Sequence, residues 1–162
     1  MFYRLLNTLD KKNAFDRAKA HCDVPCGIYD PSTAQISALT VVRMMDLMIA
    51  EHADHDHGVG HINSMARYVQ VKEEHAENAK HEVRIIWGDY FKKDKHPNVD
   101  DLVHKIMQLG SKSRQTADRE SGVAFVEVIN EFAAIFWETK GVATKKANAP
   151  YAPALEMVYP DL

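Results

Sequence analysis

The sequence predicts an all-α protein: an up-down four-helix bundle with an N-terminal metal-binding hook. From about residue 31 to residue 141, apolar side chains recur at three- and four-residue spacing, which is typical of amphipathic helices. Glycine and proline interrupt this pattern, and no long run of alternating apolar residues indicates a strand. Four helices joined by short loops favour antiparallel neighbours, so we expect a bundle.

The first helix is predicted from about Pro31 to Glu51. Asp30 suits the N-cap position, and proline is well placed at the first helical position because it lacks the backbone N–H that would have no partner there. The apolar positions of this helix follow helical spacing: Ile36, Leu39, Val42, Met45 and Ile49.

Gly58 and Gly60 end this pattern, and Asn63 or Ser64 can cap a second helix that runs to about Phe91. Its apolar positions are Val69, Ala76, Val83, Ile86 and Trp87.

Pro97 closes the next connection, and a third helix is predicted from about Val99, with Gly141 as the C-cap of the fourth. The apolar positions are Leu102, Ile106 and Leu109 in the third helix and Phe125, Ile129, Phe132 and Phe136 in the fourth. Three prolines in the tail favour an extended C-terminal arm. The predicted parts are a leader (1–20), a hook (21–30), a bundle (31–141) and an arm (142–162).

Composition excludes several classes of protein. A formal net charge of -3 provides no basic excess, so we expect neither nucleic acid nor a membrane surface as a partner. No apolar run approaches the length needed to span a bilayer. Two cysteines are too few for a secreted disulfide framework. The predicted location is the cytoplasm.

Residues 1–20 have two open interpretations. They end in Ala18-Lys19-Ala20, which suits removal of a leader. Polar residues nevertheless interrupt any apolar stretch of secretory length: Asn7, Asp10, Lys11 and Lys12. The alternative is an amphipathic helix that uses the apolar residues Phe2, Leu5, Leu6 and Leu9.

Cys22 and Cys26 are the only cysteines, and His21 precedes the first. Their spacing matches neither a common zinc knuckle nor a thioredoxin-like motif. If the chain were cut after Ala20, however, His21 would offer its α-amine and imidazole, beside the amide of Cys22 and two thiolates. Such a planar set of two nitrogens and two sulfurs, with an axial imidazole, suits Cu(II) or Ni(II).

The segment "HCDVPCGIYDP" (residues 21–31) resembles the hook of the nickel superoxide dismutases, whose pattern is H-C-D-x-P-C-G-x-Y-D-P. "WGDYFK" (residues 87–92) and "IFWETK" (residues 135–140) are similar to family segments in the second and last helices. The resemblance implies a four-helix bundle, a homohexamer, and an antioxidant oxidoreductase. This enzyme would disproportionate superoxide to dioxygen and hydrogen peroxide as nickel cycles between Ni(II) and Ni(III).

The resemblance also implies residue roles. His21, Cys22 and Cys26 would hold one nickel ion per chain, after a peptidase has removed the leader. Tyr29 would act beside them as a gate that orders substrate and water. Two further residues would shape the hook: Asp23 and Pro25.

Around the hook, this sequence departs from the family pattern: Ser37 and His75 stand where better characterised members carry a glutamate and an arginine that support the axial imidazole. Both replacements weaken that support, so the imidazole would be held differently, through Ser37 and His75 or through a water. Tyr90 and Lys92 belong to a family segment and would approach the hook. Lys72 aligns with the family and would supply positive potential, as would Arg67.

Two alternatives remain open. A cluster of histidines in the loop after the first helix suits either nickel or zinc, or is merely solvated: His52, His55, His57 and His61. The second alternative is a nickel carrier or storage protein that binds the metal without turnover. Catalysis of superoxide removal distinguishes an enzyme from a carrier.

Overall fold

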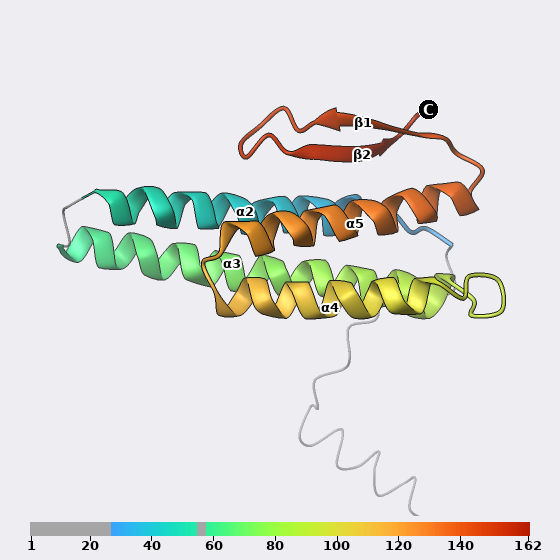
Figure 1. The fold of residues 1–162 in the computed structure, drawn as a ribbon, viewed down its shortest axis with the longest axis horizontal. Helices are drawn as coiled ribbons and strands as arrows, with labels where there is room; N and C mark the ends of the chain where they lie inside the picture. The colour runs from blue at the N-terminus through green and yellow to red at the C-terminus, as the bar shows by residue number, and fades with distance from the viewer. Residues whose placement is uncertain (1–26, 55–57) are drawn as a thin grey trace, which may run out of the picture.

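The computed structural model describes residues 27–54 and 58–162. Within them, four α-helices run alternately up and down and form an antiparallel bundle (Figure 1). The predicted all-α bundle is therefore confirmed. The helices are α2 (Ser32–Ala53), α3 (Val59–Ile85), α4 (Val99–Gln115) and α5 (Arg119–Thr139).

The start of α2 follows the predicted capping. The Asp30 carboxylate accepts a hydrogen bond from the Ser32 amide at 2.8 Å, and the Pro31 carbonyl accepts one from the Gln35 amide at 3.1 Å. Pro31 itself has helical dihedral angles. Asp30 thus acts as an N-cap, because its carboxylate accepts from the Ser32 amide, which has no partner within the helix.

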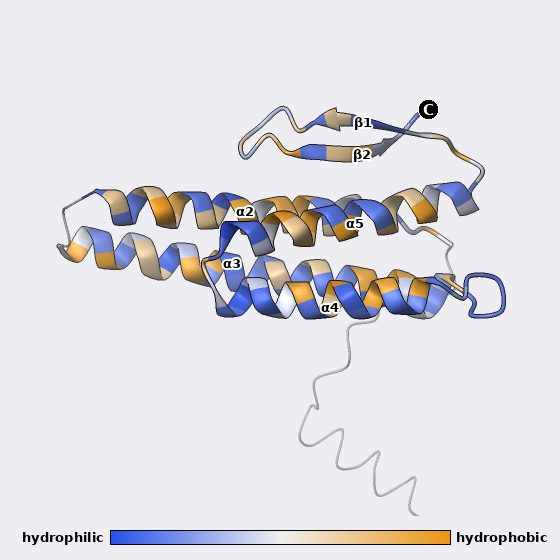
Figure 2. Cartoon of the chain, in the orientation of Figure 1, coloured by the Kyte–Doolittle hydropathy of each residue, from blue (hydrophilic) through white to orange (hydrophobic). Residues whose placement is uncertain are grey.

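The buried face of α2 is wider than its sequence pattern indicates. Ile36 and Ile49 are 55% and 49% exposed, so the prediction that they face the core is wrong. Small side chains such as Ala34 and Ala38 are buried instead, because α2 packs against both α3 and α5. Apolar and polar segments alternate along each helix (Figure 2). The aromatic core of α5 is confirmed, with Phe125, Ile129, Phe132 and Phe136 fully buried.

Gly122 allows α2 and α5 to approach closely. A Cβ atom at this position would lie 2.8 Å from the Met45 sulfur and 3.1 Å from a Val42 methyl group. Both distances are shorter than ordinary van der Waals contact, so the Met45 and Val42 side chains would have to shift to admit a larger residue.

α3 begins earlier than predicted, at Val59, because Gly58 takes the extended N-cap conformation ahead of it. At its other end the helix widens into one π-helical turn, η1 (Ile86–Tyr90), closed by a hydrogen bond from the Phe91 amide to the Ile86 carbonyl. Single π-turns of this kind are frequent at functional sites.

The C-terminal residues form a β-hairpin rather than the single extended arm that the sequence suggested. β1 (Thr144–Asn148) pairs antiparallel with β2 (Glu156–Pro160), and Lys146 lies opposite Val158. Asn130 of α5 accepts a hydrogen bond from the Val158 amide and donates one to the Glu156 carbonyl, as a neighbouring strand would. The hairpin therefore lies on the bundle, alongside α5 (Figure 1).

One helix in the described part, α2, is long and apolar enough to cross a membrane by length and composition. This corrects the expectation that no apolar run has that length. Half of its most apolar window is buried inside the bundle, as in the core helix of a globular protein.

Candidate metal centre

Only part of the predicted site can be placed. His21, Cys22, Asp23, Pro25 and Cys26 lie outside the described residues. The remaining candidates are described: Tyr29, Ser37, His75, Tyr90 and Lys92.

The described part of the hook begins at Gly27 and leads directly into the bundle. This glycine has a φ of 71°, a left-handed conformation that side-chain-bearing residues rarely adopt. Two residues later, the half-buried Tyr29 ring packs on Tyr90, with 5.8 Å between ring centroids and 49° between planes. The hook is therefore joined to the bundle through an aromatic contact one turn before α2.

Tyr90 is the centre of this contact. Its hydroxyl lies 2.6 Å from the Thr139 hydroxyl, which in turn donates to the Phe136 carbonyl at 2.6 Å. Because a threonine hydroxyl has one proton, Tyr90 must be the donor to Thr139. The π-turn at the end of α3 sets Tyr90 in this position, against the last turn of α5.

A cation lies over the same ring. Lys140 Nζ is 4.4 Å from the centroid of Tyr90 and 5.5 Å from that of Phe136. We call Tyr29, Tyr90, Phe136, Thr139 and Lys140 the tyrosine cluster. Thr139 and Lys140 were not among the predicted site residues, although the segment "IFWETK" contains both. Their roles depend on contacts with Tyr90, which residue spacing in the sequence cannot reveal.

Charges of both signs lie at this end. The N-terminus of α2 carries partial positive charge, whereas the ends of η1 and α5 carry partial negative charge and hold the exposed carboxylates of Asp89 and Glu138. Lys92 follows η1 and is exposed, with Nζ donating to the Asp89 carbonyl at 3.2 Å. It comes two residues after Tyr90, and its described hydrogen bond goes to the backbone of the π-turn.

Ser37 and His75 lie on neighbouring antiparallel helices, at equal chain distances from the α2–α3 connection. Ser37 is buried, and His75 Nδ1 lies 2.9 Å from the Val71 carbonyl. Since a carbonyl only accepts, Nδ1 carries a proton, which leaves Nε2 as the acceptor of the neutral ring.

Lys72 does not supply surface potential. It is 2% exposed, and Nζ donates to the carbonyls of Ser113, at 2.7 Å, and Arg114 at the end of α4. Burial lowers the pKa of Lys72, and the charge of Glu73 at 3.7 Å opposes this shift. Its ammonium therefore satisfies carbonyls that the end of a helix leaves unpaired.

The histidine loop is described only in part, because His55 and His57 lie outside the described residues. His61 Nδ1 is 3.6 Å from a Glu51 carboxylate oxygen. Among residues 27–54 and 58–162, no group of three or more histidine, cysteine, aspartate or glutamate side chains is arranged to hold a metal ion.

The donor set of the hook fits nickel by its chemistry. If the chain is cut after Ala20, the α-amine of His21, the amide of Cys22 and the two cysteine thiolates would offer strong, electron-rich donors, which suit Ni(II). Cysteine and histidine must lose protons to bind a metal, so binding is coupled to pH.

Comparison with known proteins agrees with this chemistry. Residues 16–140 match the family model of nickel-containing superoxide dismutase. The chain is similar to superoxide dismutase [Ni] of Streptomyces coelicolor, 36% identical over 124 residues, covering 75% of this chain and 88% of that protein. It is also similar to the same enzyme of Streptomyces seoulensis, 34% identical over 127 residues, covering 76% and 91%.

Solved structures agree as well. The native structure of nickel superoxide dismutase aligns with a TM-score of 0.64 and 35% identity, covering 74% of this chain and 99% of that chain. The structure with nickel ligation of the oxidised state aligns with a TM-score of 0.65 and 34% identity, covering 75% and 99%. The tyrosine cluster brings the hook's end and both family segments together at one end of the bundle, and the chain belongs to the nickel-containing superoxide dismutases.

Proposed function

We propose that this protein is a nickel-dependent superoxide dismutase, which converts two superoxide ions and two protons into dioxygen and hydrogen peroxide. The observation that carries the proposal is the family match over residues 16–140, which includes the complete hook pattern. Nickel, when bound, supplies a Ni(II)/Ni(III) couple that accepts an electron from one superoxide and returns it to the next.

The proposed ligands are His21, through its α-amine and imidazole, Cys22, through its amide and thiolate, and the thiolate of Cys26. One nickel ion per chain would be held. The α-amine exists only after residues 1–20 have been removed, so a leader-removing peptidase is part of the proposal. Two residues would shape the hook: Asp23 and Pro25.

Tyr29 would hold substrate and water beside the metal by hydrogen bonds from its hydroxyl. Tyr90 would act as its support, because the Tyr90 proton is already donated to Thr139 and its ring packs on Tyr29. Ser37 and His75 are the proposed support of the His21 imidazole, with His75 Nε2 as the acceptor.

The tyrosine cluster would also guide the substrate. Superoxide is an anion, and Lys140 and Lys92 lie at the end of the bundle where the hook joins. Positive potential near a site raises the rate of anion arrival, so activity should fall as salt increases. We further propose a homohexamer with an antioxidant role in the cytoplasm.

The test compares three proteins that begin at Met1, Ala20 and His21, each loaded with nickel. An α-amine loses its proton to a metal far more easily than a mid-chain amide does, since its pKa is about 7.7–8.0. We expect thiolate-to-nickel absorption and superoxide removal only in the protein that begins at His21. Equal activity of the protein that begins at Met1 would refute the amine as a ligand, and nickel binding without turnover would indicate a carrier.

A further inference from the structure

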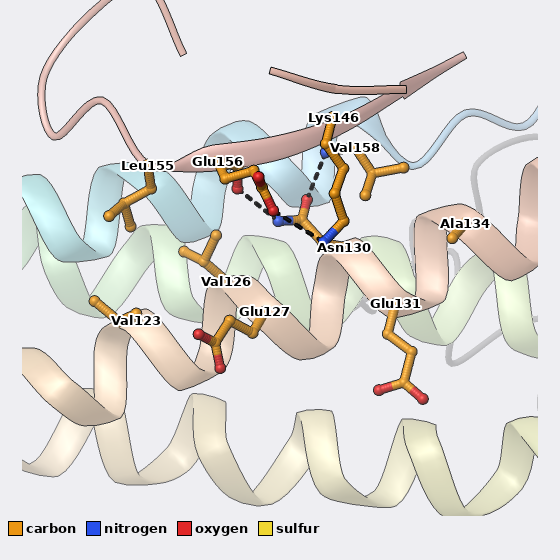
Figure 3. Close-up of a pocket in the computed structure, with 10 residues that line it drawn as sticks. All are labelled: Val123, Val126, Glu127, Asn130, Glu131, Ala134, Lys146, Leu155, Glu156 and Val158. Carbon is orange, nitrogen blue, oxygen red and sulfur yellow. Dashed lines mark hydrogen bonds and ion pairs between the residues drawn. The ribbon is translucent and has the colours of Figure 1, made fainter. Parts of the chain in front are cut away.

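A groove runs along the outward face of α5, beside the C-terminal hairpin (Figure 3). It consists of two adjoining hollows, each of about 500 Å³, which share Glu131 and Ala134. The second hollow continues to residues 141–144, at the end of α5. The floor of the first hollow is largely apolar and includes Val123, Val126, Leu155 and Val158.

The rim of this groove is acidic. Glu127, Glu131 and Glu138 are exposed and share one face of α5 by their spacing. Figure 3 shows Glu127 and Glu131 projecting from α5 on the side away from the hairpin. Across residues 27–54 and 58–162, none of these three carboxylates lies within ion-pair distance of a cation. Lys146, which also lines the groove, pairs with Glu156 at 2.9 Å and interacts with Glu127 at longer range.

Residues 1–20 have the complementary chemistry. Their cationic side chains outnumber the two aspartates: Arg4, Lys11, Lys12, Arg17 and Lys19. Their apolar side chains recur at helical spacing: Phe2, Leu5, Leu6 and Leu9. A basic segment with one apolar side suits a groove that has an apolar floor and an acidic rim.

The groove lies within reach of this segment. The described chain starts at Gly27, and Tyr29 packs on Tyr90, which is bonded to Thr139 beside Glu138. Residues 21–26 span at most about 20 Å when extended. The carboxylate row from Glu138 to Glu127 follows about 16 Å of helix.

Residues 1–20 and the C-terminal hairpin share one feature: most of both lies outside the part of the chain that matches the family. The family match covers residues 16–140, so most of residues 1–20 and the whole hairpin that walls the groove lie beyond it. The solved relatives are covered almost completely, while about a quarter of this chain has no counterpart in them.

We propose that residues 1–20 dock in the groove between α5 and the hairpin of their own chain. Their lysines and arginines face Glu127, Glu131 and Glu138, and their apolar side chains lie on the floor. Docking holds the segment ahead of His21 against the bundle until that segment is cut away. This inference goes beyond the proposed function, because it requires neither nickel nor turnover.

The first test is carbodiimide cross-linking of the full-length chain, which joins lysine ammonium groups to carboxylates in direct contact. An equal mixture of isotope-labelled and unlabelled chains separates links within one chain from links between copies. We expect links within one chain from Lys11, Lys12 or Lys19 to Glu127, Glu131 or Glu138. Links only between copies, or links to other carboxylates in place of these, would overturn the proposal.

The second test is the rate at which trypsin cuts the full-length chain after Arg17 and Lys19. Docking protects these bonds, because cleavage follows the population of the undocked state. The variant Glu127→Gln/Glu131→Gln should be cut about fivefold faster, since exposed ion pairs each contribute modestly. Its matched control is Glu74→Gln/Asp101→Asn, which neutralises two exposed carboxylates on α3 and α4.

The second test is repeated at increasing salt concentration, which weakens ion pairs. Added sodium chloride should speed cleavage of the parent chain and of the control, and should have little effect on the groove variant. Equal cleavage rates for all three chains would refute docking in this groove. Neither test measures superoxide removal, so a failure here is distinct from a failure of the proposed enzyme activity.

Discussion

The tyrosine cluster and the polar contact between α3 and α4 are held together by different interactions: aromatic packing in the first and ion pairs in the second. In the tyrosine cluster, rings pack on one another and one hydroxyl chain fixes Tyr90, with a single lysine over its face. Between α3 and α4, charges dominate: Arg114 of α4 lies 2.9 Å from Glu73 and 3.0 Å from Glu77 of α3. Within α3, Arg84 lies 2.6 Å from the same Glu77.

This difference indicates which part of the bundle has side chains available to interact with a ligand. The α3–α4 charges neutralise one another and cap a helix, so they hold two helices in register and have little capacity left for a ligand. The tyrosine cluster uses few charges and stands where the hook joins the bundle. Changes in the two regions should therefore separate activity from stability.

The largest effect is expected in the hook itself. Replacement Cys22→Ser or Cys26→Ser should abolish superoxide removal, because each removes a proposed thiolate ligand, while the bundle stays folded. Helical circular dichroism, nickel content and turnover are measured on the same sample. A serine variant with normal turnover would show that the thiolates are not the ligands.

The next effect is on stability alone. Replacement Lys72→Met removes the ammonium that two carbonyls at the end of α4 share, and should lower the free energy of unfolding by about 1–3 kcal/mol. Turnover per folded, nickel-loaded molecule should not change. Urea unfolding and activity are compared, with Lys93→Met as the control at an exposed lysine. A loss of turnover without a loss of stability would break the distinction between the two regions.

Replacement Tyr90→Phe should affect both properties, but less. It removes the hydrogen bond to Thr139 and should lower the free energy of unfolding by about 1 kcal/mol. Because Tyr90 supports Tyr29, turnover should fall as well. The double variant with Thr139→Val measures the coupling: if the two hydroxyls act together, the second replacement adds little to the first. Fully additive effects would indicate that the two hydroxyls act independently.

The smallest effect is the pH dependence of the α3–α4 charges. Burial would raise the pKa of Glu77, but the hydrogen bond and charge of Arg84, with Lys80 and Arg114, outweigh burial and lower it below the ordinary value of 4.5. The stabilisation from Glu77 is thus present above pH 4.5 and is lost as the pH falls through the lowered pKa.

Replacement Glu77→Gln should consequently flatten the acid side of the stability profile, measured by urea unfolding across acid pH. Glu77 is 41% exposed, so solvent screening keeps the effect below about 1 kcal/mol. Replacement Glu74→Gln serves as the control. A profile as steep as that of the parent chain would exclude Glu77 as a source of acid sensitivity.

Local patterns in the sequence predicted most of the helices. The Asp30-Pro31 cap, the aromatic face of α5 and the C-terminal glycine of α5, Gly141 with a φ of 69°, all hold in the structure. Each depends on residues within a few positions of one another, so spacing alone reveals it. The π-turn escaped prediction, because no spacing rule marks one extra residue in a helical turn.

The C-terminal hairpin could not be predicted from local sequence patterns. Its strands have five residues each, and β1 is exposed throughout. It is held by Asn130 and Gln35, whose amides bond β2 from helices distant in the sequence. Tertiary contact therefore decided this element, because the partners of its backbone groups lie elsewhere in the chain.

By itself, the sequence determined most of the helices, the caps at Asp30-Pro31 and Gly141, and which donor side chains the hook contains, because each of these depends on residues that stand together in the chain. Only the tertiary structure decided that Tyr29 packs on Tyr90, that Thr139 receives the Tyr90 proton, and that Lys72 is a buried cap. These side chains meet across three helices, and which faces of the helices touch depends on packing of the whole bundle.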